Sequence, residues 1–147
     1  MASPLELKLA FWNCALSPTK ATQRFSDADI EIAVYVIKSL FTLHKVQFVG
    51  LCEISRTSYD KLYDAFKYDG IDGYLLDDKT STGTQFDLAC FYLRKQIVVE
   101  KQAFVTSQLG TSSLKAAQHL VMFDLRSKSA IDIIISHWPS QLQGISK

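Results

Sequence analysis

Residues 46–53, "VQFVGLCE", place an almost wholly apolar run directly before an acidic side chain. Such a short apolar run is typical of a strand that is buried on both faces. Before it, Asp27–Leu43 repeats hydrophobic residues at helical spacing behind a capping-box pair, Ser26 and Asp29. Earlier still, Leu5–Trp12 alternates as a strand with one buried face does. Strand, helix and apolar strand in this order predict a βαβ-like opening of an α/β domain.

Downstream of this opening the sequence predicts one more helix and several strands. Ser58 is expected to cap the helix, which ends near Gly70, and a short strand and a polar loop follow. Two strand pairs are then expected, the first joined by a tight turn and the second turning at 127–129, with a loop between the pairs. The first pair is "FDLACFYLRK" with "QIVVEKQAFV". The loop is "SQLGTSSLKA". The second pair is "AAQHLVMFDLR" with "AIDIIISH".

The composition is that of a single soluble globular domain spanning residues 1–147. Hydrophobic residues make up 48% of the chain and charged residues 21%, and the net charge is only +1, so bulk charge points to neither nucleic acid nor a membrane surface. No apolar run approaches the ~20 residues of a membrane span, and no secretory signal is visible. Cys14, Cys52 and Cys90 are expected to be buried free thiols, so the expected location is cytoplasmic.

Polar side chains follow three of the expected strands. Asn13 comes directly after the first strand, Glu53 after the second and His137 after the last. The carboxyl ends of strands can collect at one edge of a mixed sheet, where a ligand crevice tends to lie. Carboxylate and amide oxygens suit Mg²⁺, and a histidine beside that ion can bind phosphate or move a proton. The pattern therefore indicates a phosphoryl-transfer site.

Each of these residues, taken singly, also has a plainer structural interpretation. Asn13 can simply end a strand, because Asn favours turns. Glu53 can be a solvated carboxylate, and His137 can be a partly buried histidine with satisfied hydrogen bonds. His44 and His119 are interpreted as structural or surface histidines. The phosphate-site hypothesis therefore depends on the three positions occurring together.

Four stretches of the sequence together resemble the endonuclease/exonuclease/phosphatase superfamily. They are "LKLAFWNCALSP" (7–18), "VQFVGLCEIS" (46–55), "FDLACFYLRK" (86–95) and "IDIIISHWPSQ" (131–141), in the family's order. The resemblance implies the N-terminal half of a deoxyribonuclease-I-like domain. The expected fold is of the α/β (α+β) class, half of a four-layer αββα sandwich, with one mixed β-sheet and helices on one face of that sheet.

The same resemblance implies a Mg²⁺-dependent phosphodiester hydrolase, first of all an endonuclease, or else a related exonuclease, phosphodiesterase or phosphatase. By resemblance, Glu53 binds Mg²⁺, with Mn²⁺ as the alternative ion, and Asn13 assists as both a metal-site and a catalytic residue. His137 contacts phosphate, and Asp87, seven residues before Arg94, matches the acid that pairs with this histidine. Nucleic acid is the first substrate expected, while phospholipid and inositol phosphate stay open.

The sequence departs from the family's pattern in two respects. Gln141 stands where an Arg commonly follows the "HWPS" word, so the resemblance does not extend to that contact. The Asp-x-Asn word and the terminal Asp-His pair of the family's second half do not occur in the 147 residues. We therefore expect an incomplete, truncated catalytic domain that is inactive alone. A missing C-terminal half or a second copy would cover its exposed sheet face.

Two alternatives stay open at this point. The chain can be a non-catalytic binding or dimerising module derived from the same fold. It can also be an unrelated α/β domain, in which case Asn13, Glu53 and His137 would lie too far apart to share one metal–phosphate site.

Overall fold

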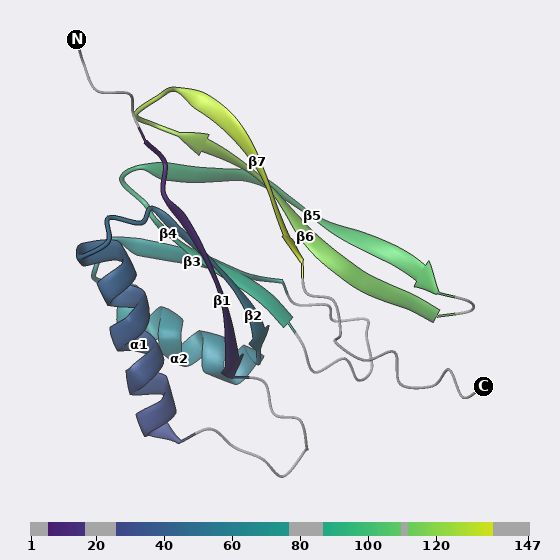
Figure 1. Cartoon of the computed structure of the whole chain (residues 1–147), viewed down its shortest axis with the longest axis horizontal. Helices are drawn as coiled ribbons and strands as arrows, with labels where there is room; N and C mark the ends of the chain where they lie inside the picture. Colours follow the sequence, from purple (N-terminus) through teal and green to yellow (C-terminus); the bar gives the residue numbers. More distant parts are fainter. Residues whose placement is uncertain (1–5, 17–25, 77–86, 110–111, 137–147) are drawn as a thin grey trace.

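The structure, a computed structural model, describes residues 6–16, 26–76, 87–109 and 112–136. Two sheets pack against each other, and two helices lie on the outer side of one sheet (Figure 1). Sheet A contains β1 (Leu9–Leu16), β2 (Phe48–Ile54), β3 (Ile71–Leu76) and β4 (Asp87–Leu93). Sheet B contains β5 (Ile97–Leu109), β6 (Ser112–Asp124) and β7 (Ser129–Ser136). The helices are α1 (Asp27–Thr42) and α2 (Arg56–Phe66).

Sheet A begins with the βαβ unit that the sequence predicts. Its strand order is β1-β2-β4-β3; β1 and β2 are parallel, while β4 is antiparallel to both of its neighbours. The capping box at the start of α1 is confirmed, because the Asp29 amide donates to the Ser26 hydroxyl and the Asp29 carboxylate accepts from the Ser26 amide. The α/β class and the mixed sheet with helices on one face are therefore confirmed.

The second helix begins earlier than expected, so the prediction that Ser58 caps it was wrong. Ser55 is the N-cap, and its hydroxyl oxygen accepts a hydrogen bond from the Ser58 amide at 3.2 Å. The buried Ser58 hydroxyl instead donates to the Leu16 carbonyl at 3.0 Å. Ser58 thus fastens the first turn of α2 to the end of β1, a tertiary role that local sequence does not reveal.

The expected single mixed sheet accounts for only four of the seven strands, because the other three form sheet B. The expected pairing of β4 with β5 was wrong, since a short turn carries the chain from sheet A to sheet B between them. The loop expected at 107–116 was also largely wrong, because β5 runs to Leu109 and β6 starts at Ser112. This polar end of the hairpin projects beyond sheet A (Figure 1), where backbone pairing needs no apolar side chains. The last hairpin, β6 with β7, is confirmed.

Two hydrophobic cores hold the layers together. One lies between the helices and sheet A, where Ile37, Leu51 and Leu62 are fully buried. The other lies between the sheets, where Leu120 and Met122 of sheet B pack against residues of sheet A. Fully burying a side chain of this size stabilises a fold by ~1.5–3 kcal/mol, so these cores supply the main driving force.

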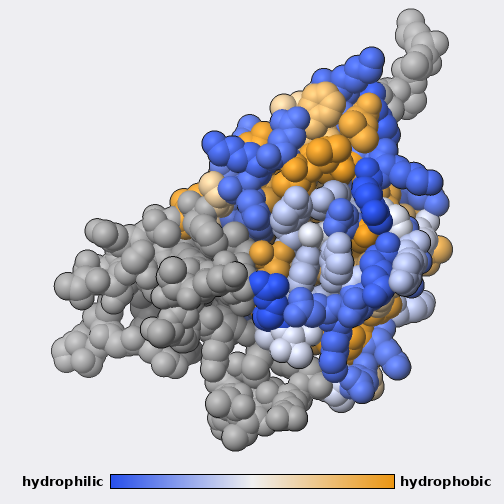
Figure 2. All heavy atoms as spheres, turned by 180° about the vertical axis from the view of Figure 1, so that it is seen from behind, coloured by the Kyte–Doolittle hydropathy of each residue, from blue (hydrophilic) through white to orange (hydrophobic). Residues whose placement is uncertain are grey.

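The outer face of sheet B lacks the cover that sheet A has. Val98 and Phe123 lie opposite each other on this face, and Ile134 on β7 is 65% exposed. No helix within the described ranges lies over it (Figure 1). Seen from behind, hydrophobic side chains gather in the upper part of the described surface, the part where sheet B lies (Figure 2).

The three cysteines are buried free thiols, as the sequence predicts. Of the helices in the described residues, neither is long and apolar enough to cross a membrane.

Candidate functional site

Three neighbouring strands of sheet A bring Asn13, Glu53 and Asp87 to one edge. Asn13 in β1 lies beside Cys52 in β2, and Ile54 in β2 lies beside the backbone of Asp87, the first residue of β4. Glu53 stands between these two paired positions of β2. The structure therefore gathers the backbone of all three predicted positions at one end of the sheet, although it does not describe the Asp87 side chain.

The fourth predicted residue, His137, lies outside the described residues. The strand that precedes it, β7, ends at Ser136. Ile135 of this strand packs against β2, since a Cβ built on Gly50 would lie 3.2 Å from Ile135 Cδ1. The end of β7 therefore approaches the middle of β2, two residues before Cys52.

The backbones of β1 and β2 are irregular at the same level. The pairing register shifts between Asn13 and Leu16 in β1 and between Cys52 and Ile54 in β2. Ala15 (φ 51°) and Glu53 (φ 57°) both adopt the left-handed conformation. That conformation costs a residue other than glycine of order 1–3 kcal/mol and persists where surrounding contacts impose it, often at functional sites.

Hydrogen bonds hold both irregularities in place. The Asn13 side-chain oxygen accepts from the Ala15 amide at 3.1 Å, which closes a local turn of the kind that Asn favours. The Cys14 thiol donates across to the Cys52 carbonyl, with sulfur and oxygen 3.2 Å apart. Its sulfur also lies 3.7 Å from the Glu53 carbonyl oxygen. The thiol therefore ties the bend of β1 directly to the bend of β2.

The electrostatics of this edge favour hard oxygen donors over sulfur. Burial raises the pKa of Cys14 to about 11, and the negative charge of Glu53 adds to the rise. Burial likewise raises the pKa of Cys52 to about 12, again with a contribution from Glu53. Both thiols are therefore neutral at physiological pH and make poor metal ligands.

The donors that remain are the Glu53 carboxylate and the Asn13 amide oxygen, a set that fits Mg²⁺ or Mn²⁺, which accept one or two carboxylates and keep several waters. Within the described part of the chain, no three His, Cys, Asp or Glu side chains converge as a ready metal cluster.

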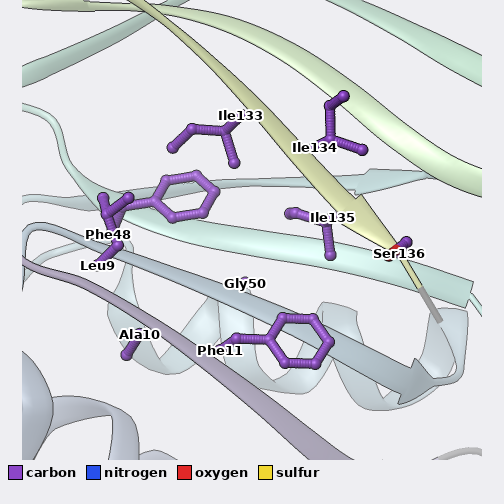
Figure 3. A pocket seen from close by; sticks show the side chains of 9 residues that line it. All are labelled: Leu9, Ala10, Phe11, Phe48, Gly50, Ile133, Ile134, Ile135 and Ser136. Carbon is purple, nitrogen blue, oxygen red and sulfur yellow. The ribbon is translucent and has the colours of Figure 1, made fainter.

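A groove lies between β1 and β7, next to the edge of sheet A that carries Asn13 and Glu53 (Figure 3). Leu9 and Phe11 line it from β1, Gly50 from the floor, and Ile133 and Ile135 from β7, around a volume of about 340 Å³. Leu9 is 49% and Phe11 55% exposed. The lining is apolar except for Ser136 at the end of β7, and it contains no cationic side chain to bind phosphate, so the groove is not itself the proposed phosphate site. It is the open side of the space between the sheets.

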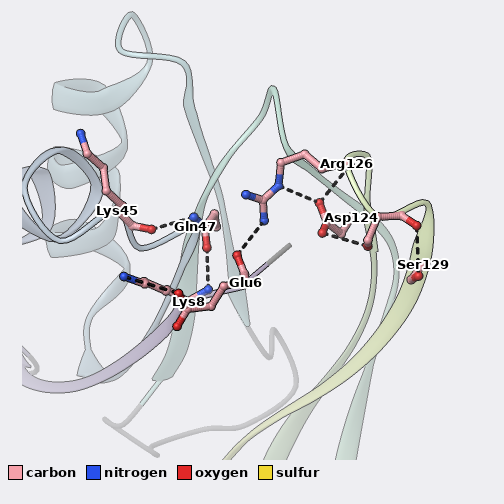
Figure 4. Close-up of polar contacts among 8 residues, drawn as sticks. Glu6, Lys8, Lys45, Gln47, Asp124, Arg126 and Ser129 are labelled. Atoms are coloured by element: carbon pink, nitrogen blue, oxygen red, sulfur yellow. Dashed lines mark hydrogen bonds and ion pairs between the residues drawn. The ribbon is translucent and has the colours of Figure 1, made fainter. Parts of the chain in front are cut away.

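The opposite end of the two sheets is closed by polar contacts (Figure 4). The Arg126 guanidinium bonds the Asp124 carboxylate at 3.3 Å and the Glu6 carbonyl at 3.3 Å. Gln47 accepts from the Lys8 amide at 2.6 Å and donates to the Lys45 carbonyl. These contacts hold together the starts of β1 and β2 and the turn between β6 and β7, at the end of the sheets opposite Asn13 and Glu53.

The sequence analysis missed one conspicuous residue, Gln118 in β6. Its side chain is 0% exposed, and neither its amide nitrogen nor its amide oxygen has a hydrogen-bond partner among the described residues. Strand alternation could have identified it, because Gln118 has the same parity as Leu120 and Met122, which face the core.

His119 belongs to a different surface. Its ring nitrogen lies 2.6 Å from the Asp132 carboxylate, on the outer side of sheet B, where both residues are partly exposed. This placement agrees with the interpretation of His119 as a surface histidine.

Comparisons with known proteins give a match in fold but none in sequence. No family model and no curated protein sequence matches the chain. A mannosyl-6-phosphatase of Bacteroides thetaiotaomicron is 12% identical, with a TM-score of 0.63, and the match covers 92% of this chain and 54% of that one. The human Nocturnin catalytic domain with bound sulfate is 15% identical, with a TM-score of 0.62, covering 90% and 50%. D. rerio TDP2 complexed with a single-strand DNA product is 11% identical, with a TM-score of 0.61, covering 93% and 48%.

The same fold recurs in structures described as endonuclease/exonuclease/phosphatase proteins from two Bacteroides species. The chain therefore shares the fold of endonuclease/exonuclease/phosphatase structures, as its sequence resemblance implied. It spans about half the length of the chains that it matches.

Proposed function

We propose that this chain supplies part of the active site of a metal-dependent phosphoester hydrolase. The observation that carries the proposal is the paired break in β1 and β2, which brings Asn13 and Glu53 to one edge of a fold shared with nucleases and phosphatases. The bends carry Cys14, Leu16 and Ile54 into the core, and they also place left-handed backbone beside the Asn13 and Glu53 oxygens. That second feature suits the holding of a hydrated cation.

In this proposal Glu53 and Asn13 hold Mg²⁺, with Mn²⁺ as the alternative. The ion would polarise a phosphoryl oxygen and stabilise charge on the leaving oxygen. Cys14 keeps the two bends in register, so the two oxygens stay at a fixed separation. His137 donates a hydrogen bond to a phosphate oxygen. A hydrogen-bond acceptor for its second ring nitrogen fixes the tautomer, and Asp87 is the acceptor that the resemblance offers.

The substrate that we propose is a nucleic acid phosphodiester, with a smaller phosphate ester as the alternative. The matched structures include both kinds of protein, since one is a TDP2 bound to single-stranded DNA and another is a sugar phosphatase. The net charge of +1 gives no support for tight binding of a long duplex, so we propose a short single-stranded segment as the nucleic acid. Further site residues would come from polypeptide beyond the 147 residues, and we propose a cytoplasmic location.

A plasmid-nicking assay tests the chemistry. With an incomplete site, the wild-type chain should nick supercoiled DNA only slowly with Mg²⁺ and not at all with EDTA, because one lost transition-state donor alone costs ~10²–10³ in rate. Glu53→Gln should abolish this activity. Glu100→Gln, which removes an exposed carboxylate from β5, is the matched control and should retain it.

Equal nicking by wild type and Glu53→Gln would reject the metal assignment. A wild-type chain that forms a stable homodimer and shows no nicking would favour the alternative, a binding module with the same fold.

A further inference from the structure

The helix α1 has an apolar side that faces away from the rest of the protein. Its buried side belongs to the core between the helices and sheet A. On the opposite side of this outer helix (Figure 1), Ile32 is 61% and Tyr35 is 72% exposed. Between Ile30 and Phe41 the only charged residues are Glu31 and Lys38. A helix that is apolar on all sides is ordinarily buried on all sides, so the outer side of α1 points to a partner.

The exposed side has the spacing of a seam along which helices pair. Ala28, Ile32, Tyr35 and Ser39 follow one another at intervals of four, three and four residues. These are the a and d positions of a heptad, which line up along one side of a helix and pack against an equivalent helix. All four residues are at least partly exposed, so nothing in the described chain buries this seam.

Two charged residues beside the seam indicate what covers it. Glu31 and Lys38 both occupy the g position, on the same flank of the seam. Asp69 holds the Lys38 ammonium at 2.7 Å, and the Lys38 side chain is still 42% exposed. An ammonium group has three donors, so Lys38 can also bind a second carboxylate. The flank thus presents one acidic and one basic group, two turns apart.

A second copy of α1 in antiparallel order matches both the seam and the charges. With a two-fold axis across the middle of the seam, Ile32 of each copy faces Tyr35 of the other, and Ala28 faces Ser39. Glu31 of each copy then lies within two residues, about 3 Å along the helix axis, of Lys38 of the other. A parallel pair would bring Glu31 opposite Val36 instead. The charge pattern is therefore complementary to itself only in the antiparallel order.

We propose that the chain forms a homodimer through the outer side of α1, with the two α1 helices packed antiparallel. One helix face makes a small interface, so the dissociation constant should be on the order of 10–100 µM. The contact lies on the helix side of sheet A, so it leaves the edge with Asn13 and Glu53 open. It does not depend on the proposed function.

Sedimentation equilibrium of the full chain over a range of concentrations tests the dimer. Wild type should show a reversible monomer–dimer equilibrium. Ile32→Gln puts an amide into the centre of the seam, and Glu31→Lys replaces two attractive charge pairs with two repulsive ones. Each variant should weaken the dimer at least about tenfold. Both side chains are exposed in the monomer, so the urea unfolding of dilute protein should not change.

Complementary charge variants test the pairing itself. Glu31→Lys and Lys38→Glu should each associate poorly alone, whereas an equimolar mixture of the two should form a heterodimer about as strong as the wild-type dimer. Glu100→Lys makes the same charge reversal on β5 and is the matched control, so it should associate as wild type does.

Disulfide cross-linking reads the orientation and keeps both charges. A mixture of Ala28→Cys and Ser39→Cys should cross-link one variant to the other under mild oxidation, because the antiparallel order places these positions face to face. The three cysteines of the chain itself are buried and should not interfere. Neither variant should cross-link efficiently to itself.

A wild-type chain that stays monomeric up to about 1 mM would overturn the proposal. A dimer that is equally strong in wild type, Ile32→Gln and Glu31→Lys would also overturn it, since another surface would then form the contact. Efficient cross-linking of Ala28→Cys to itself would reject the antiparallel order. Dimerisation through α1 in a chain without Mg²⁺-dependent nicking would uphold this inference and reject the proposed function, whereas nicking by a strictly monomeric chain would do the reverse.

Discussion

Sheet A is covered on both faces, whereas sheet B is covered on only one face by the described residues. Sheet A has helices on one face and sheet B on the other, and residues such as Leu51 and Phe91 are fully buried. Sheet B shares one face with sheet A, but its outer face carries the exposed Val98 and Ile134 without a described helix over them. An exposed apolar face of a sheet is a site where another element or chain can pack.

The same contrast holds for the strand edges. β1 and β7 are the last strands on one side of their sheets, and the apolar groove runs between them. An open edge presents unpaired backbone groups to which another strand can add. The chain spans about half the length of the structures that it matches. Substitutions in the two sheets test this difference, beginning with the fully buried ring of Phe91.

Phe91→Ala should have the largest effect, because this ring is fully buried between sheet A and α2, 5.0 Å from the Phe66 ring centroid. Deleting such a ring costs ~3–5 kcal/mol of unfolding free energy through lost burial and a cavity. Urea unfolding followed by circular dichroism measures the loss. A loss below about 1 kcal/mol would show that this core is loose and that sheet A is no better packed than sheet B.

Asp124→Asn should have the next largest effect. This buried carboxylate accepts hydrogen bonds at the end of the two sheets opposite Asn13 and Glu53. Burial raises the pKa of Asp124, but hydrogen bonds from the Arg126 amide, the Ser127 hydroxyl and the Arg126 guanidinium outweigh it, so the pKa is lowered overall. Breaking these bonds should cost about 1–3 kcal/mol at pH 7.

The pH dependence of the Asp124 effect follows from the lowered pKa. A carboxylate with a lowered folded-state pKa stabilises the fold above its unfolded value, near 4, and loses that contribution as pH falls through the folded value. The difference in unfolding free energy between wild type and Asp124→Asn should therefore shrink below pH 4. A difference that is constant from pH 7 to pH 2.5 would contradict the assignment.

Cys14→Ala should cost about 1 kcal/mol, since it removes the thiol that joins the bends of β1 and β2 and leaves two carbonyls without that donor. Amide exchange should quicken at Ala15 and Glu53 and stay unchanged in sheet B. Cys90→Ala, also a buried thiol, serves as the control for general loosening. Equal quickening in both variants would remove Cys14 from the site.

Ile134→Thr should have the smallest effect, because the side chain is 65% exposed on the outer face of sheet B. A surface change of this kind alters stability by ~0.5 kcal/mol or less. It should instead raise the concentration at which the chain aggregates, which light scattering measures. A loss above 2 kcal/mol would mean that this face is already covered within the chain.

Much of the fold could be predicted from local sequence signals. The capping box of Ser26 and Asp29 and the helical repeat behind it located α1, and the apolar run at 46–53 located β2 within two residues. Sheet membership could not be predicted in the same way. A short turn fits a hairpin as well as a crossing between sheets, and only the long-range pairing of β4 with β2 and β3 decides.

The sequence indicated which residues belong to the candidate site, but not the backbone bends and the thiol contact that shape it. The sequence placed Asn13 and Glu53 directly after their strands, but β1 runs to Leu16 and β2 to Ile54, so both residues lie inside the strands, near their carboxyl ends. The two backbone bends and the thiol that joins them depend on contacts 38 residues apart, which no local pattern encodes. Gln118 was missed because a glutamine in a strand is ordinarily assigned to the solvent side.

Mn²⁺ binding to the full chain, followed by paramagnetic broadening of backbone amide signals, tests the central claim most directly. Substoichiometric Mn²⁺ should selectively broaden the amides of Asn13 and Glu53, and Mg²⁺ should restore them by competition. Glu53→Gln should abolish the selective broadening, and Glu100→Gln should retain it. Broadening that is absent from this edge of sheet A, or that is equal in wild type and Glu53→Gln, would contradict a metal site at Asn13 and Glu53.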